Sequence, residues 1–277
     1  SQFVGKKVVL PIANREIPVI AEDTTDMELG TGALKVTPAH SPVDFEIGKK
    51  HSLPIVNVIN EEGKMTGSIP ERFVGMGTTE CSKALCKELD DLGLLVKIEN
   101  IKHEVVICER CKSAIEPIIS NQWYLNVESL AKRALEALKK GDVSVVPKGQ
   151  QKALEYFYEN IQSWCISRQL WWGHRIPVFT CDDCDHQWAD KADEPESCPK
   201  CGSKHYTQDP DVLDTWFSSS LWPFSTLGWP EKTKDLDYFY PTSVMETGYD
   251  ILFFWVARMI MIGLEFMCEV PFHTVYL

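Results

Sequence analysis

Residues 181–201 read CDDCDHQWADKADEPESCPKC and hold two Cys-x-x-Cys pairs separated by thirteen residues. The pairs are Cys181/Cys184 and Cys198/Cys201. Each pair in this pattern supplies two thiolates from a tight backbone turn, and four thiolates match the tetrahedral preference of Zn²⁺. We therefore predict that these four cysteines bind one structural Zn²⁺ in a zinc ribbon.

The charge of the ribbon, residues 179–206, indicates its role. The stretch has three lysines against seven acids, which are Asp182, Asp183, Asp185, Asp190, Asp193, Glu194 and Glu196. Four thiolates on one Zn²⁺ add further negative charge, whereas phosphate binding depends on Lys and Arg. We expect the ribbon to be a structural cross-link and not a nucleic-acid contact.

A third pair, Cys108/Cys111, stands alone. Half a zinc site needs two more ligands, and the other four cysteines form no matching pair. A redox-active pair is the alternative, but the helix and the βαβ pattern that accompany such a motif are missing. We interpret Cys108 and Cys111 as a half-site, empty or poorly occupied, whose second half lies outside these 277 residues.

Composition and charge limit the class of protein. Hydrophobic residues make up 44% and charged residues 25% of 277, which predicts a globular chain, more readily of two domains than one. The formal charge of −12 argues against a general nucleic-acid coat protein. Ten cysteines without a secretory leader predict a cytoplasmic protein.

The most apolar run, residues 251–267, resembles a membrane span only in part. Arg258 interrupts it, and no uninterrupted stretch reaches the roughly 18 residues that a span needs. We predict a buried helix there and no membrane partner.

Residues 1–119 alternate short apolar runs with turns, which predicts a compact α+β barrel. The expected strands are 7–10, 16–20, 33–36 and 54–59, and the expected helices are 42–51 and 79–92. Ser41 followed by Pro42 is typical of a helix start.

Residues 120–277 alternate strands with helices, which predicts a parallel, doubly wound sheet. The expected helices are 128–140, 152–164 and 251–267, and the expected strands are 143–146, 176–179, 212–217, 243–245 and 271–277. The whole chain is then an α/β protein with an inserted zinc ribbon.

Three blocks of sequence resemble a known family. Residues 164–177 read WCISRQLWWGHRIP, too polar for a core and too aromatic for a plain loop. Together with DPDVLDTWFSSSLWPFSTLGWP at 209–230 and TGYDI at 247–251, they resemble class I aminoacyl-tRNA synthetases of the valine, isoleucine and leucine group. The valine-specific members are the most similar.

This resemblance implies that residues 120–277 are part of a Rossmann-type catalytic domain that uses ATP and Mg²⁺. It implies that Trp216 lines the amino-acid pocket and that Gly248 and Asp250 lie near the adenylate. Trp216 is equally well interpreted as an ordinary buried aromatic residue. Asp250 has a second interpretation as the N-cap of the next helix.

Residues 30–46, GTGALKVTPAHSPVDFE, resemble the editing domain of the same family, so residues 1–119 are expected to be its C-terminal part. The resemblance implies that Lys35, Thr37 and Asp44 line a site that hydrolyses mischarged tRNA, with Asp44 pairing the substrate ammonium. Valine and threonine are nearly isosteric, so one binding pocket discriminates them poorly and a second, hydrolytic site is needed. The alternative is that Ser41 and Asp44 form a helix capping box.

Two features depart from the family pattern. Valine-specific members commonly have Asp where this chain has Ser41, and the Thr-Thr-Arg-Pro segment that completes the editing pocket is absent from the 277 residues. The departure at Ser41 bears on recognition of the threonine hydroxyl.

The resemblance implies a parent protein that activates valine with ATP, charges tRNA(Val) and hydrolyses threonyl-tRNA(Val). We expect the chain, which begins with Ser1, to be an internal piece and a monomer. The family's His-Ile-Gly-His and Lys-Met-Ser-Lys-Ser motifs are absent, so it should form no valyl-adenylate alone. Two alternatives stay open: an isoleucine-type synthetase, and a non-enzymatic zinc module that binds RNA or protein.

Overall fold

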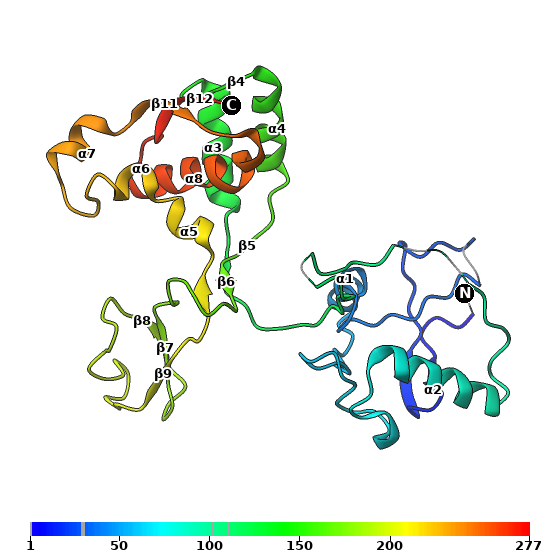
Figure 1. The fold of residues 1–277 in the computed structure, drawn as a ribbon. Helices are drawn as coiled ribbons and strands as arrows, with labels where there is room; N and C mark the ends of the chain where they lie inside the picture. The colour runs from blue at the N-terminus through cyan, green and yellow to red at the C-terminus, as the bar shows by residue number, and fades with distance from the viewer. Residues whose placement is uncertain (1, 29–30, 101, 103, 110) are drawn as a thin grey trace. The chain divides into compact units, whose positions relative to one another are not determined.

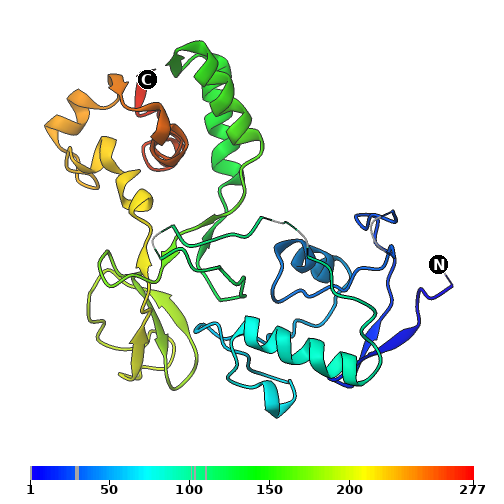
Figure 2. The same cartoon turned by 45° about the vertical axis from the view of Figure 1, so that its right-hand side comes forward.

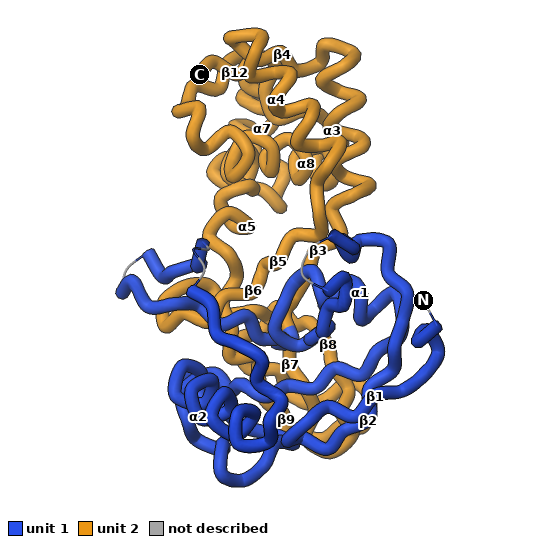
Figure 3. Tube along the Cα trace, turned by 90° about the vertical axis from the view of Figure 1, so that its right-hand side faces the viewer, with its two compact units in different colours: residues 1–121 blue, residues 122–277 orange. Residues whose placement is uncertain are grey.

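The computed structural model describes residues 2–28, 31–100, 102, 104–109 and 111–277. The chain divides into two compact units, residues 1–121 and 122–277 (Figure 3). Their assignment as the editing and catalytic domains, expected at 1–119 and 120–277, stays a prediction. All nine tryptophans belong to the second unit, so tryptophan fluorescence reports on that unit alone.

The first unit has few regular elements (Figure 1). They are β1 (Lys7–Leu10), β2 (Arg15–Pro18), α1 (Pro42–Lys50), the 3₁₀ turn η1 (Glu71–Phe73) and α2 (Thr78–Asp91). β1 and β2 form an antiparallel hairpin in which Lys7 faces Pro18. The two expected helices are confirmed to within a residue or so at each end.

Two expected strands of the first unit are wrong. Residues 33–36 form no strand, and residues 54–59 contribute only a single bridge, from Ile59 to Met65. β-branched residues favour an extended backbone, but a strand also needs a neighbouring segment in register along its length, and among the described residues only the bridge at Ile59 pairs with either run. The α+β barrel stays a prediction.

The second unit is built on a three-stranded parallel sheet in the order β11-β12-β4, which confirms the expected mixed α/β fold with a parallel sheet (Figure 1). Its elements are β4 (Ser144–Val146), β11 (Thr242–Glu246), β12 (Phe272–Tyr276), α3 (Glu128–Lys140), α4 (Lys148–Glu159) and α8 (Ala257–Phe266). Val145 and Val275 face each other across the sheet and are completely buried.

Helices α3, α4 and α8 supply the core of this unit; α3 and α4 lie side by side (Figure 2). α3 buries small residues, Ala131 and Ala134, against its neighbours, and ends at Gly141 in the left-handed conformation at φ 87°. That conformation is the reason for a glycine there.

The helix expected at 152–164 is wrong at both ends. α4 begins four residues earlier, after Pro147 (φ −78°), and ends at Glu159. Trp164 instead starts strand β5 (Trp164–Cys165), because its backbone pairs with Leu125 of β3 (Tyr124–Leu125). Tertiary pairing outweighs the helical spacing of the apolar residues.

The apolar run at 251–267 is confirmed as a buried helix. It comprises the 3₁₀ turn η2 (Tyr249–Ile251), a π-helical turn η3 (Leu252–Val256) and α8. Met259, Ile260 and Met261 are fully buried in the core. No helix in the described part of the chain is long and apolar enough to cross a membrane.

The remaining elements form short strands and helices. They are β6 (Ser167–Arg168), β7 (Val178–Cys181), β8 (Gln187–Ala189), β9 (Tyr206–Gln208), β10 (Val212–Leu213), α5 (Thr215–Ser219), α6 (Trp222–Ser225) and α7 (Lys234–Phe239). β7 pairs with β8 and β9 in an antiparallel sheet. Phe179 is buried between Trp188 and Tyr206, with ring centroids 5.7 and 5.5 Å away, so this small sheet has an aromatic core of its own.

Candidate functional site

The four cysteines of the two close pairs converge on one point. The Sγ atoms of Cys181, Cys184, Cys198 and Cys201 all lie within 4.8 Å of one another. Cys181 Sγ is 3.5 Å from Cys201 Sγ, and Cys184 Sγ is 3.8 Å from Cys198 Sγ. Four sulfurs bound tetrahedrally at about 2.3 Å from a Zn²⁺ lie about 3.8 Å apart, so the donor set and its size fit this ion.

Two backbone turns of the same form hold these thiols. In the first, Asp185 N donates to Cys181 O at 3.0 Å; in the second, Gly202 N donates to Cys198 O at 2.9 Å. Asp185 and Gly202 each follow the second cysteine of their pair and both have a positive φ, 55° and 75°. The turn reverses the chain and points both thiols of a pair to the same side.

The thiols interact strongly. Burial disfavours the Cys198 thiolate, but the N–H groups of Cys201 and Lys200 outweigh it and lower its pKa to about 7. The Ser203 N–H favours the Cys201 thiolate, but the neighbouring thiols Cys184 and Cys181 outweigh it and raise the pKa of Cys201 to about 12. One thiolate forms readily, whereas four need a cation among them.

The Cys108/Cys111 pair has the same turn. Lys112 N donates to Cys108 O at 2.9 Å, Cys108 N donates to Ser113 O at 2.8 Å, and Lys112 has φ 60°. Hydrogen bonds, of which those from Ser113 have the largest effect, lower the pKa of Cys111 to about 7. Among the described residues, only the cluster at 181–201 brings three or more possible metal ligands together, so no partner pair lies beside Cys108 and Cys111 there.

The three expected editing residues lie together in the first unit. Lys35 Nζ donates to Thr37 Oγ1 at 3.0 Å, and Thr37 N donates to Asp44 Oδ2 at 2.7 Å. Lys35 is exposed, and Thr37 and Asp44 are half-buried. The Lys35 ammonium thus meets the Thr37 hydroxyl, and the Asp44 carboxylate, in the first turn of α1, bonds the Thr37 backbone.

The capping interpretation of this turn is half right. Ser41 is the N-cap of α1, and its Oγ accepts from Asp44 N at 3.3 Å. The reciprocal bond of a capping box is replaced, because the Asp44 carboxylate accepts from Thr37 N instead. Asp44 therefore ties the turn to the helix. Gly30, at the start of the expected motif, lies outside the described residues.

The expected nucleotide-side residues follow the carboxyl end of β11. Gly248 is the N-cap of η2 and Asp250 lies in its first turn, so the proposed N-cap role of Asp250 is wrong. A Cβ at Gly248 would lie 2.4 Å from Asp250 Oδ1, so the exposed Asp250 carboxylate would have to rotate away. Trp216 on α5 is half-buried and stacks on Phe254, with centroids 5.9 Å apart.

A buried carboxylate beside these residues escaped the sequence analysis. Asp214 is 5% exposed and accepts from Trp164 Nε1 at 2.9 Å, Arg168 Nη2 at 2.8 Å and Trp216 N at 3.2 Å. It ends the strand expected at 212–217, because it caps α5 from Thr215 onward.

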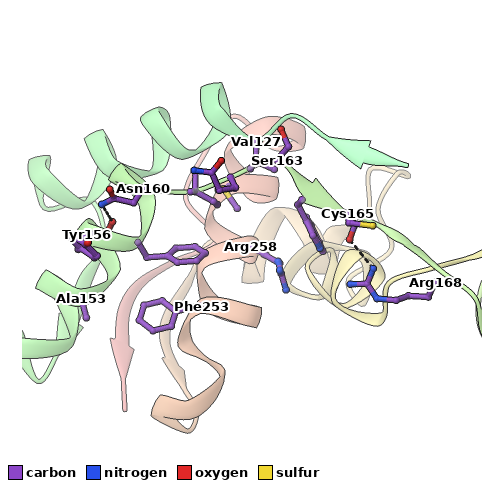
Figure 4. Close-up of a pocket in the computed structure, with 14 residues that line it drawn as sticks. Val127, Ala153, Tyr156, Asn160, Ser163, Cys165, Arg168, Phe253 and Arg258 are labelled. Carbon is purple, nitrogen blue, oxygen red and sulfur yellow. Dashed lines mark hydrogen bonds between the residues drawn. The ribbon is translucent and has the colours of Figure 1, made fainter. Parts of the chain in front are cut away.

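Arg258, whose place inside an apolar helix was the one available signal, completes this group. Its guanidinium lies 4.0 Å from the ring centroid of Trp164. Burial lowers the pKa of Arg258 from its ordinary value, a shift that Asp214 opposes and Arg168 increases. Arg168 and Arg258 face a mostly apolar cavity of about 640 Å³ (Figure 4), which Tyr156, Phe157 and Phe253 also line.

Residues 10–277 match the family of class I tRNA synthetases (I, L, M and V), and the chain belongs to this family. It is 52% identical over 277 residues to the valine–tRNA ligase of Treponema denticola, and 56% identical over 275 residues to that of Dehalococcoides mccartyi. These matches cover 100% and 99% of this chain but 30% and 31% of the relatives, so the chain spans about a third of their length.

A methionyl-tRNA synthetase of Mycobacterium tuberculosis bound to methionyl-adenylate is among the similar solved structures. The superposition has a TM-score of 0.39 at 14% identity and covers 62% of this chain and 29% of that one.

Proposed function

We propose that this chain is part of a valine–tRNA ligase whose whole protein activates valine with ATP and Mg²⁺ and transfers it to tRNA(Val). The observation that carries the proposal is the identity of 52–56% to valine–tRNA ligases along essentially the whole chain. The motifs at 164–177, 209–230 and 247–251 fall within these matches.

For the second unit we propose the roles that the family resemblance implies. Trp216 lines the valine pocket, and Gly248 and Asp250 face the adenylate. Their position supports this proposal, because ligands of parallel α/β sheets bind beyond the carboxyl ends of the strands. Gly248 and Asp250 follow β11 at that end and are exposed.

For the first unit we propose hydrolysis of mischarged threonyl-tRNA(Val). Lys35, Thr37 and Asp44 form the site, and the Asp44 carboxylate pairs the ammonium of the threonyl ester. The hydrogen bonds of Thr37 to both Lys35 and Asp44 support the proposal, because they bring these three residues together. A second, hydrolytic site is required, because one binding pocket discriminates poorly between valine and the nearly isosteric threonine.

For the metal we propose one structural Zn²⁺ on Cys181, Cys184, Cys198 and Cys201. The Sγ spacings support it, and a closed set of four thiolates leaves no coordination position for substrate. Cys108 and Cys111, held in the same kind of turn, are proposed as half of a second site.

Amino-acid-dependent ATP–pyrophosphate exchange by the whole protein that contains this chain tests the synthetase proposal. We expect the highest kcat/KM with valine and weaker activation of threonine. Preferred activation of isoleucine would assign the isoleucine-type alternative. A lack of exchange with every amino acid tested would favour the non-enzymatic zinc module.

A matched pair of variants of the same protein tests the editing proposal. We expect Asp44→Ala to keep valine activation and to accumulate threonyl-tRNA(Val). Glu46→Ala is the control, because Glu46 is an exposed carboxylate on the same helix. Equal hydrolysis of threonyl-tRNA(Val) by both variants and the unmodified protein would contradict the role of Asp44.

A further inference from the structure

His40 lies in the turn between the expected editing residues and bonds two segments far away in sequence. Val58 N donates to His40 Nε2 at 3.0 Å, and His40 Nδ1 lies 2.9 Å from Pro117 O. An amide N–H only donates and a carbonyl only accepts. Nε2 must therefore be unprotonated and Nδ1 must carry the proton, so the two bonds select one neutral tautomer of the ring.

We propose that His40 is a positioning residue for the hydrolysis of mischarged tRNA, an inference that rests on the proposed editing function. The ring holds the turn of residues 37–44 in place through its two bonds. It contacts no substrate itself.

A continuous series of hydrogen bonds connects the His40 backbone to the proposed site. His40 N donates to Thr37 O at 3.1 Å, and Thr37 N donates to Asp44 Oδ2 at 2.7 Å. Lys35 Nζ completes the series with its bond to Thr37 Oγ1. A shift of His40 therefore displaces Thr37, whose hydroxyl bonds Lys35 and whose backbone N–H bonds Asp44.

The segment that contains Val58 is itself held by backbone hydrogen bonds. Thr66 N donates to Val58 O at 2.9 Å, and a bridge joins Ile59 to Met65 next to it. On the other side of the turn, Pro38 is buried against α1, where a Cβ at Gly48 would lie 2.8 Å from its side chain. Tight packing and the His40 bonds thus hold the turn from two sides.

The same bonds exclude His40 from proton transfer. A general base needs a free ring nitrogen within reach of the proton that it takes. Both ring nitrogens of His40 are occupied by backbone groups, so the ring acts through geometry and not through its proton.

Nuclear magnetic resonance of this chain tests the bonds directly. We expect the ¹⁵N shifts of the His40 ring to report the neutral Nδ1–H tautomer, and the Val58 amide to exchange slowly. His40→Asn retains a donor in place of Nδ1 and His40→Gln an acceptor in place of Nε2, so only His40→Asn should expose the Val58 amide. An Nε2–H tautomer, or a rapidly exchanging Val58 amide in the unmodified chain, would overturn the proposal.

Hydrolysis of threonyl-tRNA(Val) by the whole protein tests the positioning. We expect His40→Ala to lower kcat by about 10- to 100-fold with little change in KM, because misplacement of about 1 Å costs that much. His40→Asn and His40→Gln should each retain more activity than His40→Ala. The control is His51→Ala, which should retain full activity, because His51 bonds Glu22 and neither partner of His40.

The two proposals fail in different ways. Full hydrolysis by His40→Ala, with loss of hydrolysis in Asp44→Ala, would overturn the positioning role and leave the editing function intact. Full hydrolysis by Asp44→Ala as well would overturn both. Valine activation, which we assign to the second unit, should be unchanged in all of these variants. Slow amide exchange in α1 of each variant shows that its first unit folds.

Discussion

At the scale of single residues, buried polar side chains bond segments of the chain that are distant in sequence. Asp214 gathers an indole, a guanidinium and a backbone N–H although its neighbours are aromatic. Glu22 is similar in the first unit: its side chain is 5% exposed, and it bonds Lys50 at 3.0 Å and His51 at 2.8 Å. Each joins segments that are distant in the sequence.

Asp214→Ala should lower the free energy of unfolding of the second unit by roughly 2–3 kcal/mol. Removing one member of a buried pair costs about 3–5 kcal/mol, and the partly exposed Arg168 reduces this figure. Urea unfolding followed by tryptophan fluorescence measures the change. Glu136→Gln, which removes an exposed ion pair with Lys140, should change the free energy of unfolding by less than about 0.5 kcal/mol. An equal effect of the two substitutions would contradict the stabilising role of the Asp214 bonds.

Glu22→Gln should destabilise α1 at neutral pH, and the difference from the unmodified chain should vanish in acid. Hydrogen bonds from Lys50 and then His51 lower the pKa of Glu22 to about 2. A depressed pKa stabilises the folded state above the unfolded value of about 4.3, and this stabilisation is lost as pH falls toward 2. Amide exchange of α1 at pH 7 and pH 3 measures it: at pH 3, which lies between the two pKa values, the difference should be smaller than at pH 7.

The control for Glu22 is Glu16→Gln, which removes an exposed pair with Lys7 in the same unit. This variant should exchange like the unmodified chain at both pH values. A Glu22→Gln effect that grows as pH falls would contradict the assigned pKa shift.

At the scale of elements, the zinc ribbon and helix α8 show two ways to build a core. The ribbon combines Phe179, Trp188 and Tyr206 with four thiols, because its three short strands enclose little apolar volume. α8 instead buries apolar residues nearly all round and approaches its neighbours closely through Gly263.

Elemental analysis should find one Zn²⁺ per chain. Cys198→Ser should lose the metal, because a closed tetrahedral site needs all four thiolates. Cys108→Ser is the matched control and should keep it, since Cys108 is not part of the cluster. Equal loss in the two variants, or two ions per chain, would contradict the assignment.

Gly263→Ala should destabilise the second unit by about 1–3 kcal/mol through overpacking. Its Cβ would lie 2.9 Å from Tyr240 Oη and 3.1 Å from Pro271 Cδ. Gly149→Ala in α4 has open space and should be neutral or stabilising by up to about 1 kcal/mol. Fluorescence-detected unfolding compares the two; a stabilising Gly263→Ala would show that the helix can shift away.

At the scale of the whole molecule, two units with different cores make up the chain. The second has a continuous apolar core between the parallel sheet and α3, α4 and α8. The first has few buried residues, and side-chain bonds such as those of His40 and Glu22 join its segments.

The chain on its own should give ATP–pyrophosphate exchange at background level with valine. The two motifs through which the family contacts the ATP phosphates are absent from the 277 residues. The whole protein is the positive control. Valine-dependent exchange by the chain alone would contradict this expectation.

The sequence by itself determined the elements whose ends depend on local interactions. Ser41 and Pro42 start α1, Gly141 ends α3, and both helices lie where the pattern predicts them. The spacing of the four cysteines likewise predicted their convergence, because each pair forms its own turn. The family was recognisable for a similar reason, since its motifs are contiguous.

Only the tertiary structure decided where α4 ends, that residues 33–36 form no strand, and which groups surround Asp214 and His40. Trp164 lies 50 residues from Asp214, and His40 lies 77 residues from Pro117. Such pairs are invisible to local patterns, because their bonds form only when packing brings distant backbone and side chains within 3 Å. Cysteine turns and helix caps form between residues that are close in sequence. The bonds of a buried carboxylate such as Asp214, or of a histidine that joins two segments such as His40, form between residues that are distant in sequence and close only in the folded chain.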